Sequence, residues 1–218
     1  MALITDYVTV AEMKGFLRIT DTVDDTELAF AVTAASRTID QAANRHFGQE
    51  DPATARYYTA TAPASVTRNG RVPTDLFFGR WNLETDDIST TTSLVVKTDQ
   101  DDDGVFETTL VLNTDFRLWP YNAPGESRPF ERIVLASSGS FPVHPRGVEI
   151  TAKWGWTSVP SLIRQAARIQ AARLSKRRDS PFGVAGSPEM GNELRLLAKL
   201  DPDVAVLVRA HERLWGWA

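Results

Sequence analysis

The sequence predicts an α+β fold in which both ends of the chain form a helical bundle and an antiparallel, β-rich segment is inserted between them. Three observations support this prediction. Apolar residues recur every three or four positions in residues 1–50, they alternate in residues 51–157, and helical spacing returns after Pro160. With 218 residues, 42% of them apolar, the chain is long enough to bury a substantial core.

Three regions follow from this reading. Residues 1–50 are expected to be the N-terminal helices of the bundle. Residues 51–157 are the β-rich insertion. Residues 158–218 are a basic helix, a break rich in proline and glycine, and a C-terminal arm.

The N-terminal region predicts two helices. Thr9 and Glu12 have the spacing of a capping box and predict the start of the first helix. Asp24 opens the second in a looser Asp-x-x-Glu pattern, and Gly48 is expected to end it because glycine tolerates the left-handed conformation. The predicted apolar stripes are Val10, Met13 and Leu17 in the first helix and Leu28, Val32, Ala35, Ile39 and Ala42 in the second.

Alternating apolar residues in the middle region predict antiparallel strands. Every second residue is apolar in 148–156, and a further strand is expected to carry Phe106, Thr108, Leu110 and Leu112 on one face. The polar residues 97–104 would form a turn between two strands. Residues 118–129 contain three prolines and one glycine and indicate a loop. A small antiparallel sheet or barrel is therefore expected.

Ser161 is expected to cap a helix that is basic along its length. Residues 161–178 contain six basic side chains and no acidic one. The predicted apolar side is Leu162, Ala166, Ile169 and Leu174. The candidate contacts to neighbouring subunits or to a DNA channel are Arg164, Arg168, Arg173 and Arg177.

Three interpretations of this basic helix stay open: phosphate binding, a solvated face, or salt bridges to acidic neighbours. The formal net charge of −4 argues against a protein whose main partner is nucleic acid. Acidic residues gather elsewhere, with eight of them against one lysine in residues 84–107. An acidic β region and a basic helix on one chain suit head-to-tail contacts between copies, which can close into a ring.

An enzyme is not expected. The chain has no cysteine, and its three histidines, His46, His144 and His211, lack the spacing of metal ligands. No nucleophile elbow, phosphate loop or dinucleotide fingerprint is present. No catalytic residue and no cofactor-binding residue is therefore assigned, and no cofactor is expected.

Asp99, Asp101 and Asp103, followed by Gly104, match the opening of a calcium-binding loop. The match fails at the twelfth position, where Leu110 cannot supply a bidentate carboxylate. A solvated hairpin turn with Gly104 at positive φ is the preferred interpretation. A calcium-dependent binding module, for a carbohydrate or a receptor, is kept as an alternative function from another class.

The C-terminus combines residue types that dominate protein interfaces, with Arg209, Arg213, Trp215 and Trp217 close to the end. These residues either form an interface or belong to a last helix that packs onto its own bundle. No basic and apolar signal peptide opens the chain, and no apolar run approaches the roughly 20 residues that span a bilayer, so no membrane partner is expected.

Motifs along nearly the whole chain, in the same order, resemble the head–tail connector (adaptor, or head completion) proteins of long-tailed bacteriophages. They are VAEMKGFLRI (10–19), DDTEL (24–28) and NRHF (44–47), then an acidic Asp-Gly hairpin leading to TTL (108–110) and DFRLWP (115–120), then VEITAKWGW (148–156), a helix, KRRDSPFGVAG (176–186) and DPD (201–203).

The resemblance implies a mostly helical virion protein, in some members with a β insertion, that is not an enzyme. Members form rings, typically of twelve subunits, beneath the portal and above the next neck component. Their C-terminal segments grip the portal, so the expected portal interface of this chain is Arg209, Arg213, Trp215 and Trp217. The ring continues the DNA channel, through which genomic DNA passes without sequence-specific binding. The implied location is the head–tail neck, assembled in the bacterial cytoplasm. A neck stopper or a tail-completion protein is the alternative within virion proteins, and either is an expected partner of the ring. The β insertion is longer than in the smallest members, so its role is not carried over.

Overall fold

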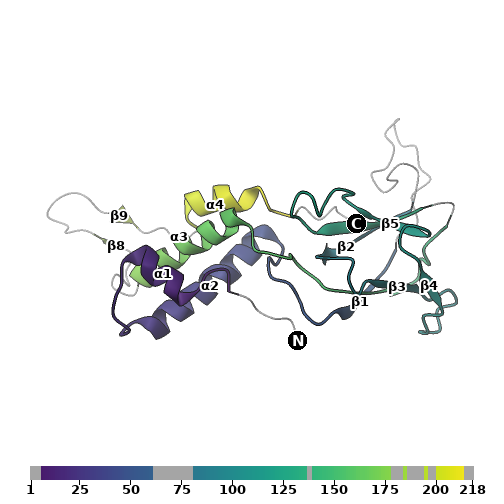
Figure 1. The fold of residues 1–218 in the computed structure, drawn as a ribbon, viewed down its shortest axis with the longest axis horizontal. Helices are drawn as coiled ribbons and strands as arrows, with labels where there is room; N and C mark the ends of the chain where they lie inside the picture. The colour runs from purple at the N-terminus through teal and green to yellow at the C-terminus, as the bar shows by residue number, and fades with distance from the viewer. Residues whose placement is uncertain are drawn as a thin grey trace. The chain divides into compact units, whose positions relative to one another are not determined.

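The computed structural model describes residues 6–60, 81–136, 139–177 and 200–213, with the backbone of two short strands at 184–185 and 194–195. The chain divides into two compact units (Figure 1). The β unit is built on Gln49–Ser158, and the helical unit on Ile4–Gly48 with Val159–Ala218. Among the described residues there are four α-helices and two main antiparallel sheets, which confirms the predicted mixed helix and antiparallel-sheet class.

The first helix, α1 (Val10–Leu17), begins as predicted. The Thr9 hydroxyl accepts a hydrogen bond from the Glu12 backbone N–H (3.2 Å), and the Glu12 carboxylate accepts one from the Thr9 N–H (2.8 Å). This reciprocal pair is a capping box, and it satisfies two backbone donors that a helix start leaves unpaired. Met13 is fully buried, while Val10 and Leu17 on the same face are half-buried.

The second helix, α2 (Asp25–Ala43), buries most of the predicted stripe. Its inner face includes Leu28, Val32, Ala35 and Ile39. The stripe ends on Ala43 and not on the predicted Ala42, because a step of four from Ile39 stays on the buried face better than a step of three.

Both predicted ends of α2 differ in detail. Asp24 is the N-cap residue, but its side chain makes no capping hydrogen bond. The predicted end at Gly48 is wrong: Asn44 takes the left-handed conformation (φ 51°), and its N–H donates to the Asp40 carbonyl. After glycine, asparagine is the residue type that most readily adopts the left-handed conformation at helix ends.

The basic helix α3 (Ser161–Arg177) starts at Ser161 itself, and the Arg164 N–H donates to the Pro160 carbonyl (3.0 Å). Its predicted apolar side is displaced by one residue. Leu162 is 44% exposed, and the buried residues are Ile163, Ala166, Ala167, Gln170 and Ala171. Adjacent alanines make two neighbouring stripes equally apolar in sequence, so only the packing of α3 against α2 selects one.

The last helix, α4 (Pro202–Arg209), packs on α2 and α3. Its N-cap Asp201 accepts a hydrogen bond from the Asp203 N–H (3.0 Å), and Val204 and Val208 are buried. Beyond the helix, the Arg213 N–H donates to the Ala43 carbonyl at the end of α2 (2.8 Å). The C-terminal arm that was expected at the end of residues 158–218 therefore includes a helix that belongs to the helical unit. Between α3 and α4, β8 (Val184–Ala185) pairs antiparallel with β9 (Leu194–Arg195).

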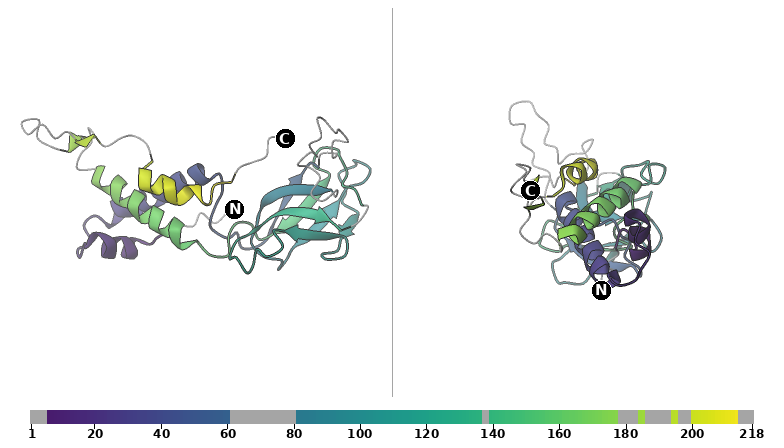
Figure 2. Two further views of the ribbon diagram at one scale, coloured as in Figure 1. Left: turned by 90° about the horizontal axis from the view of Figure 1, so that it is seen from above. Right: turned by 90° about the vertical axis from the view of Figure 1, so that its left-hand side faces the viewer.

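The β unit contains a four-stranded sheet in the order β1-β7-β3-β4 and a three-stranded sheet in the order β2-β6-β5, and all neighbouring strands are antiparallel. Figure 2 shows the strands of this unit clearly. The first sheet comprises β1 (Thr54–Tyr58), β7 (Val148–Ala152), β3 (Val95–Thr98) and β4 (Thr108–Leu110). The second comprises β2 (Asn82–Ile88), β6 (Phe130–Leu135) and β5 (Phe116–Trp119).

The predicted alternation is confirmed in 148–156, where Val148, Ile150, Ala152, Trp154 and Trp156 are all buried. The strand that was expected to carry Phe106 to Leu112 is shorter, because only Thr108–Leu110 pairs with β3. The predicted loop at 118–129 begins two residues late, since Leu118 and Trp119 belong to β5. Within the described residues, no helix is long and apolar enough to cross a membrane.

Candidate functional site

The arginines of α3 form ion pairs within the helical unit. Arg164 and Arg168 both pair with Glu12 of α1, the latter at 3.5 Å. Arg173 pairs with Asp201, the N-cap residue of α4, at 3.2 Å and is only 14% exposed. Of the three interpretations of the basic helix, salt bridges to acidic neighbours are therefore realised at these three positions.

These contacts place α1 and α4 on opposite sides of α3. At 3.6 residues per turn, Arg164 and Arg168 lie about half a turn from Gln170 and Arg173. The first pair contacts α1, and the second contacts Asp201, whose N–H donates to the Gln170 side chain at 3.5 Å. Figures 1 and 2 show α4 along one side of α3 and α1 on another. The basic helix thus joins the other elements of the helical unit.

The C-terminal residues singled out by the sequence separate in the structure. Arg209 is exposed on the last turn of α4. Arg213 is 8% exposed, and its backbone is fixed by Ala43. Trp215 and Trp217 lie outside the described residues. Of the predicted interface residues, Arg209 has its side chain at the surface and Arg213 is packed inside the unit.

A groove of about 450 Å³ lies between the end of α1, the first half of α2 and the last turn of α3. Its apolar wall includes Leu17, Leu28 and Phe30, and Phe30 is 66% exposed. Asp24, Glu27 and Lys176 also line it, so two carboxylates stand against one ammonium group. No sequence pattern predicted this groove, because Phe30 lies on the side of α2 that its apolar stripe leaves to solvent.

A buried polar network fixes the N-terminal segment to α2. The Tyr7 hydroxyl donates to Asp40 and accepts from the Phe47 N–H (2.9 Å), and the Tyr7 N–H donates to the Ser36 hydroxyl (3.1 Å). His46 lies 3.2 Å from both the Tyr7 hydroxyl and Asp40. Burial, and then the neighbouring Asp40, raise the pKa of Tyr7, so this phenol stays neutral. His46 therefore has a structural role. No local sequence pattern marks this network, because its members are up to 40 residues apart.

In the β unit, an analogous cluster links the two sheets. Arg56 on β1 pairs with Asp86 on β2 at 2.7 Å and with Glu50 at 2.6 Å. Its guanidinium carbon lies 4.6 Å from the centre of the Trp154 ring, within range of a cation–π interaction. The Tyr58 hydroxyl also donates to Asp86 (2.9 Å). No local motif predicts this cluster, since the pairing of strands far apart in the sequence creates it.

The acidic hairpin between β3 and β4 is held by its own backbone. The Asp99 carboxylate accepts hydrogen bonds from the N–H groups of Asp102 (2.9 Å), Gly104 (2.9 Å) and Asp101 (3.2 Å). Burial would raise the pKa of Asp99, but these donors outweigh it and the pKa is lowered. Gly104 has φ +86°, as the turn interpretation predicted.

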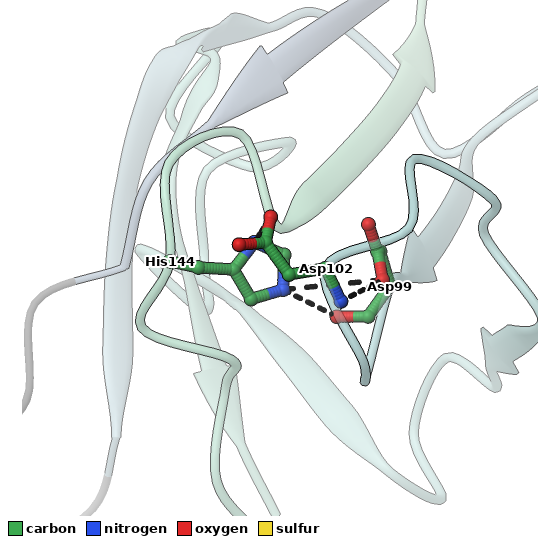
Figure 3. Close-up of side chains that lie close together, drawn as sticks. All are labelled: Asp99, Asp102 and His144. Carbon is green, nitrogen blue, oxygen red and sulfur yellow. Dashed lines mark hydrogen bonds and ion pairs between the residues drawn. The ribbon is translucent and has the colours of Figure 1, made fainter.

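His144 closes this hairpin from the other side (Figure 3). Its Nε2 donates to the Asp99 carbonyl (2.9 Å), and its Nδ1 lies 3.1 Å from the Asp102 carboxylate. The hydrogen bond to the Asp99 carbonyl, then the one to the Pro145 carbonyl and the charges of Asp102 and Asp99, raise the pKa of His144. A β-carbon on Gly147 would come within 2.9 Å of the His144 ring, so Gly147 leaves the space that the ring needs.

The three aspartates of the calcium-loop motif lie close together, and Glu107 joins them. One oxygen from each of Asp99, Asp101, Asp103 and Glu107 falls within 4.8 Å of the others, and Asp99, Asp102 and His144 form a second such group. The carboxylate of Asp99, however, already serves three backbone donors. The twelfth position, Leu110, lies on β4. The acidic cluster is thus accounted for as a self-capped hairpin turn.

The third histidine, His211, also contacts its own unit. Its ring packs edge-on against Phe47 with centroids 5.9 Å apart, and burial lowers its pKa. His46 and His144 contact the Tyr7–Asp40 network and the acidic hairpin, respectively. The candidate site is the outer surface of the helical unit, where the groove and exposed apolar side chains lie.

No protein-family model and no curated protein sequence matches the chain. Among the solved structures that match the chain, two are described here, and both match over its full length. One chain comes from the neck of an empty gene transfer agent (GTA) particle, computed with C6 symmetry, with a TM-score of 0.52 and 17% identity over 100% of this chain and 94% of that one. The other comes from the virion of a native gene transfer agent particle, with a TM-score of 0.53 and 19% identity over the same shares.

At these identities the comparisons show a shared fold. The fold that this chain shares is that of a chain in the neck of a phage-like particle. This finding agrees with the resemblance to phage head–tail connector proteins that the sequence motifs indicate.

Proposed function

We propose that this protein is a head–tail adaptor: a structural virion protein that forms a ring, docks beneath the portal, joins the capsid to the tail and continues the DNA channel. The observation that carries the proposal is the fold shared with a particle-neck chain over the whole sequence, at 94% coverage of that chain. A likeness restricted to one unit would support only a common building block. Here the helices and the β unit both fall within the matched length.

The organisation of the helical unit supports a role in assembly. Its arginines join α1 and α4 to α3 through ion pairs, and the same unit has exposed apolar side chains such as Phe30 and Val206. Packed elements with exposed apolar groups suit a protein that works by docking, because little order has to be created on binding. No cofactor is required for this function, and the role is not enzymatic.

The partners follow from the place in the particle. We propose a homo-oligomeric ring, twelve-fold as the resemblance implies, with portal on one side and a stopper or tail-completion protein on the other. Genomic DNA would pass through the ring without sequence-specific binding. The protein would be part of the virion neck and would assemble in the host cytoplasm.

The portal contact is assigned to the C-terminal residues beyond α4. Trp215 and Trp217 have the composition of interface hot spots. Arg213 is less suited to this role than the sequence predicted, because its side chain is buried in the helical unit. Of the α3 arginines, Arg173 is likewise less suited, because its side chain is only 14% exposed and pairs with Asp201. Arg164 and Arg168 also pair with Glu12, but their side chains are 45% and 32% exposed, so we keep them, with Arg177, as candidates for subunit or channel contacts.

Electron microscopy of the purified protein, alone and mixed with portal, tests the proposal. Rings stacked coaxially on portal are the expected result. A protein that stays monomeric and indifferent to portal would overturn it. Rings that bind tail components and not portal would instead favour the alternative, a neck stopper or tail-completion protein.

A further inference from the structure

Two surfaces of the helical unit have complementary apolar and charged side chains. The first is the groove described above, between α1, α2 and α3. The second is the outward face of α4, which we define as the α4 ridge: Pro202, Val206 and Arg209. We propose that the α4 ridge of one copy docks into the groove of a second copy of this chain.

The α4 ridge is apolar where a surface helix is usually polar. Val204 and Val208 point into the helical unit and are at most 2% exposed. At about 100° per residue, Pro202, Val206 and Arg209 lie on the opposite side of the helix. Val206 is 73% exposed, and exposed alanines at 205 and 210 flank it. Among the described residues of α4, the apolar character thus continues around the helix onto its outer side.

The groove offers the matching chemistry. Phe30, 66% exposed, and Leu28 and Ala31 beneath it provide an apolar surface for Val206. Glu27 is exposed at the same groove, three residues before Phe30, and its carboxylate can pair with Arg209. The groove volume of about 450 Å³ accommodates a few large side chains, as a ridge of three residues requires.

The two surfaces cannot meet within one copy. The end of α4 is fixed at the C-terminal end of α2, where the Arg213 N–H bonds the Ala43 carbonyl. The groove uses Asp24, the N-cap residue of α2, and α2 residues between 27 and 34, nine or more residues before Ala43. In addition, α4 turns Val204 and Val208, not the ridge, toward its own unit. The occupant must therefore be supplied by another copy.

The position of the two surfaces also suits ring formation. The groove lies at the α1 side of α3, and α4 lies on the opposite side, as the contacts of Glu12 and Asp201 establish. A contact between two different surfaces on opposite sides of a subunit is heterologous, and repeated contacts of this kind close into a ring when the rotation permits. The inference rests on the proposed ring function. It assigns Arg209 to the subunit contact and leaves the portal to Trp215 and Trp217.

Because the chain contains no cysteine, the contact can be tested by introduced disulfides. Phe30→Cys and Val206→Cys, both at exposed positions, are made as two separate variants, and one of them carries a mass tag. The two proteins are mixed, assembled on portal and then oxidised. We expect a tagged–untagged dimer that neither variant gives alone. Tyr121→Cys, an exposed position on the β unit, replaces Val206→Cys as the matched control and should give background cross-linking only.

A charge exchange tests the same contact without disulfides. Glu27→Arg or Arg209→Glu alone should weaken self-association about tenfold in sedimentation experiments, and the double variant should recover most of the loss. If rings form on portal but the mixed cysteine variants cross-link no more than the control, the ridge-in-groove contact is wrong and the proposed function stands. If no ring forms on portal at all, the proposed function fails as well.

Discussion

The acidic hairpin of the β unit and the helix α4 of the helical unit make an instructive contrast. The hairpin, Asp99 to Gly104, is the sharpest local motif of the sequence. The carboxylate of Asp99, however, accepts hydrogen bonds from three backbone N–H groups of the hairpin itself. The α4 segment carries only the short DPD motif (201–203) at its start, yet it has both a buried face and an exposed apolar face.

The contrast teaches that conspicuous charge and available surface are different properties. A carboxylate that caps a turn is stabilised by nearby donors and has little left to offer a partner. An exposed valine on a helix that is already packed gains nothing from its own unit. The α4 helix, and not the acidic hairpin, is therefore where we look for contacts between copies.

Removing α4 should have the largest effect of all. A chain that stops at Asp201 loses the buried Val204 and Val208, each worth about 1.5–3 kcal/mol of burial, and the backbone bond to Ala43. The helical unit should then unfold at a markedly lower temperature, measured by circular dichroism. A chain that stops at Arg213 keeps α4 and should melt like the full protein while losing portal binding. Equal melting of both truncated chains would contradict the structural role of α4.

Substitutions on the buried and exposed faces of α4 should differ by several kcal/mol in their effect on the free energy of unfolding. Val208→Lys places an ammonium group in the core and should destabilise the helical unit by about 3 kcal/mol or more in urea unfolding. Val206→Lys, at a position 73% exposed, should change the free energy of unfolding by about 0.5 kcal/mol at most. A large loss of stability in Val206→Lys would mean that the outward face packs within its own subunit.

Asp99→Ala should lower the thermal midpoint of the β unit, because three backbone donors lose their acceptor. The change should be smaller than that of Val208→Lys, since the loop is at the surface and water can replace part of the lost bonding. Asp101→Ala is the matched control, as Asp101 is exposed, and should leave the midpoint nearly unchanged. If both variants melt alike, the Asp99 hydrogen bonds do not hold the hairpin.

The smallest effect concerns pH. The folded-state pKa of His144 is raised, so protonated His144 stabilises the hairpin. This stabilisation is fully present below the unfolded-state pKa of about 6.5 and is lost as the pH rises through the higher folded-state pKa. The folded-state pKa of Asp99 is lowered, so ionised Asp99 stabilises the hairpin at higher pH. This stabilisation is present above about pH 3.9, the unfolded-state pKa, and is lost as the pH falls through the lower folded-state pKa. Hairpin stability should therefore be greatest between about pH 4 and pH 6.5.

Hydrogen exchange of the Asp102 and Gly104 amides across this pH range measures that stability. His144→Gln should abolish the loss of protection above about pH 6.5 and leave the acid side unchanged. Gly147→Ala should have a similar effect, because the added methyl group would press on the His144 ring. Protection that falls equally in wild type and His144→Gln above this pH would exclude the histidine as its cause.

Much of the fold was predictable from local rules. The Thr9–Glu12 capping box, the buried stripe of α2 and the alternation through Trp154 and Trp156 follow from neighbouring residues that interact in a fixed geometry. Gly104 likewise takes the positive φ that its turn requires.

The remainder depended on contacts between residues far apart in the sequence. Because α3 contains adjacent alanines, its sequence fits two buried stripes that differ by one position. Packing against α2 selects which of the two is buried. Tyr7 with Asp40, Arg56 with Asp86, and Arg173 with Asp201 are pairs that no local pattern marks. The sequence by itself therefore determined the class of fold and the resemblance, because periodicity and motif order are local. Tertiary structure alone decided which charged side chains form ion pairs within the chain and which apolar side chains stay exposed for a partner. Both depend on which element packs against each face of a helix or strand.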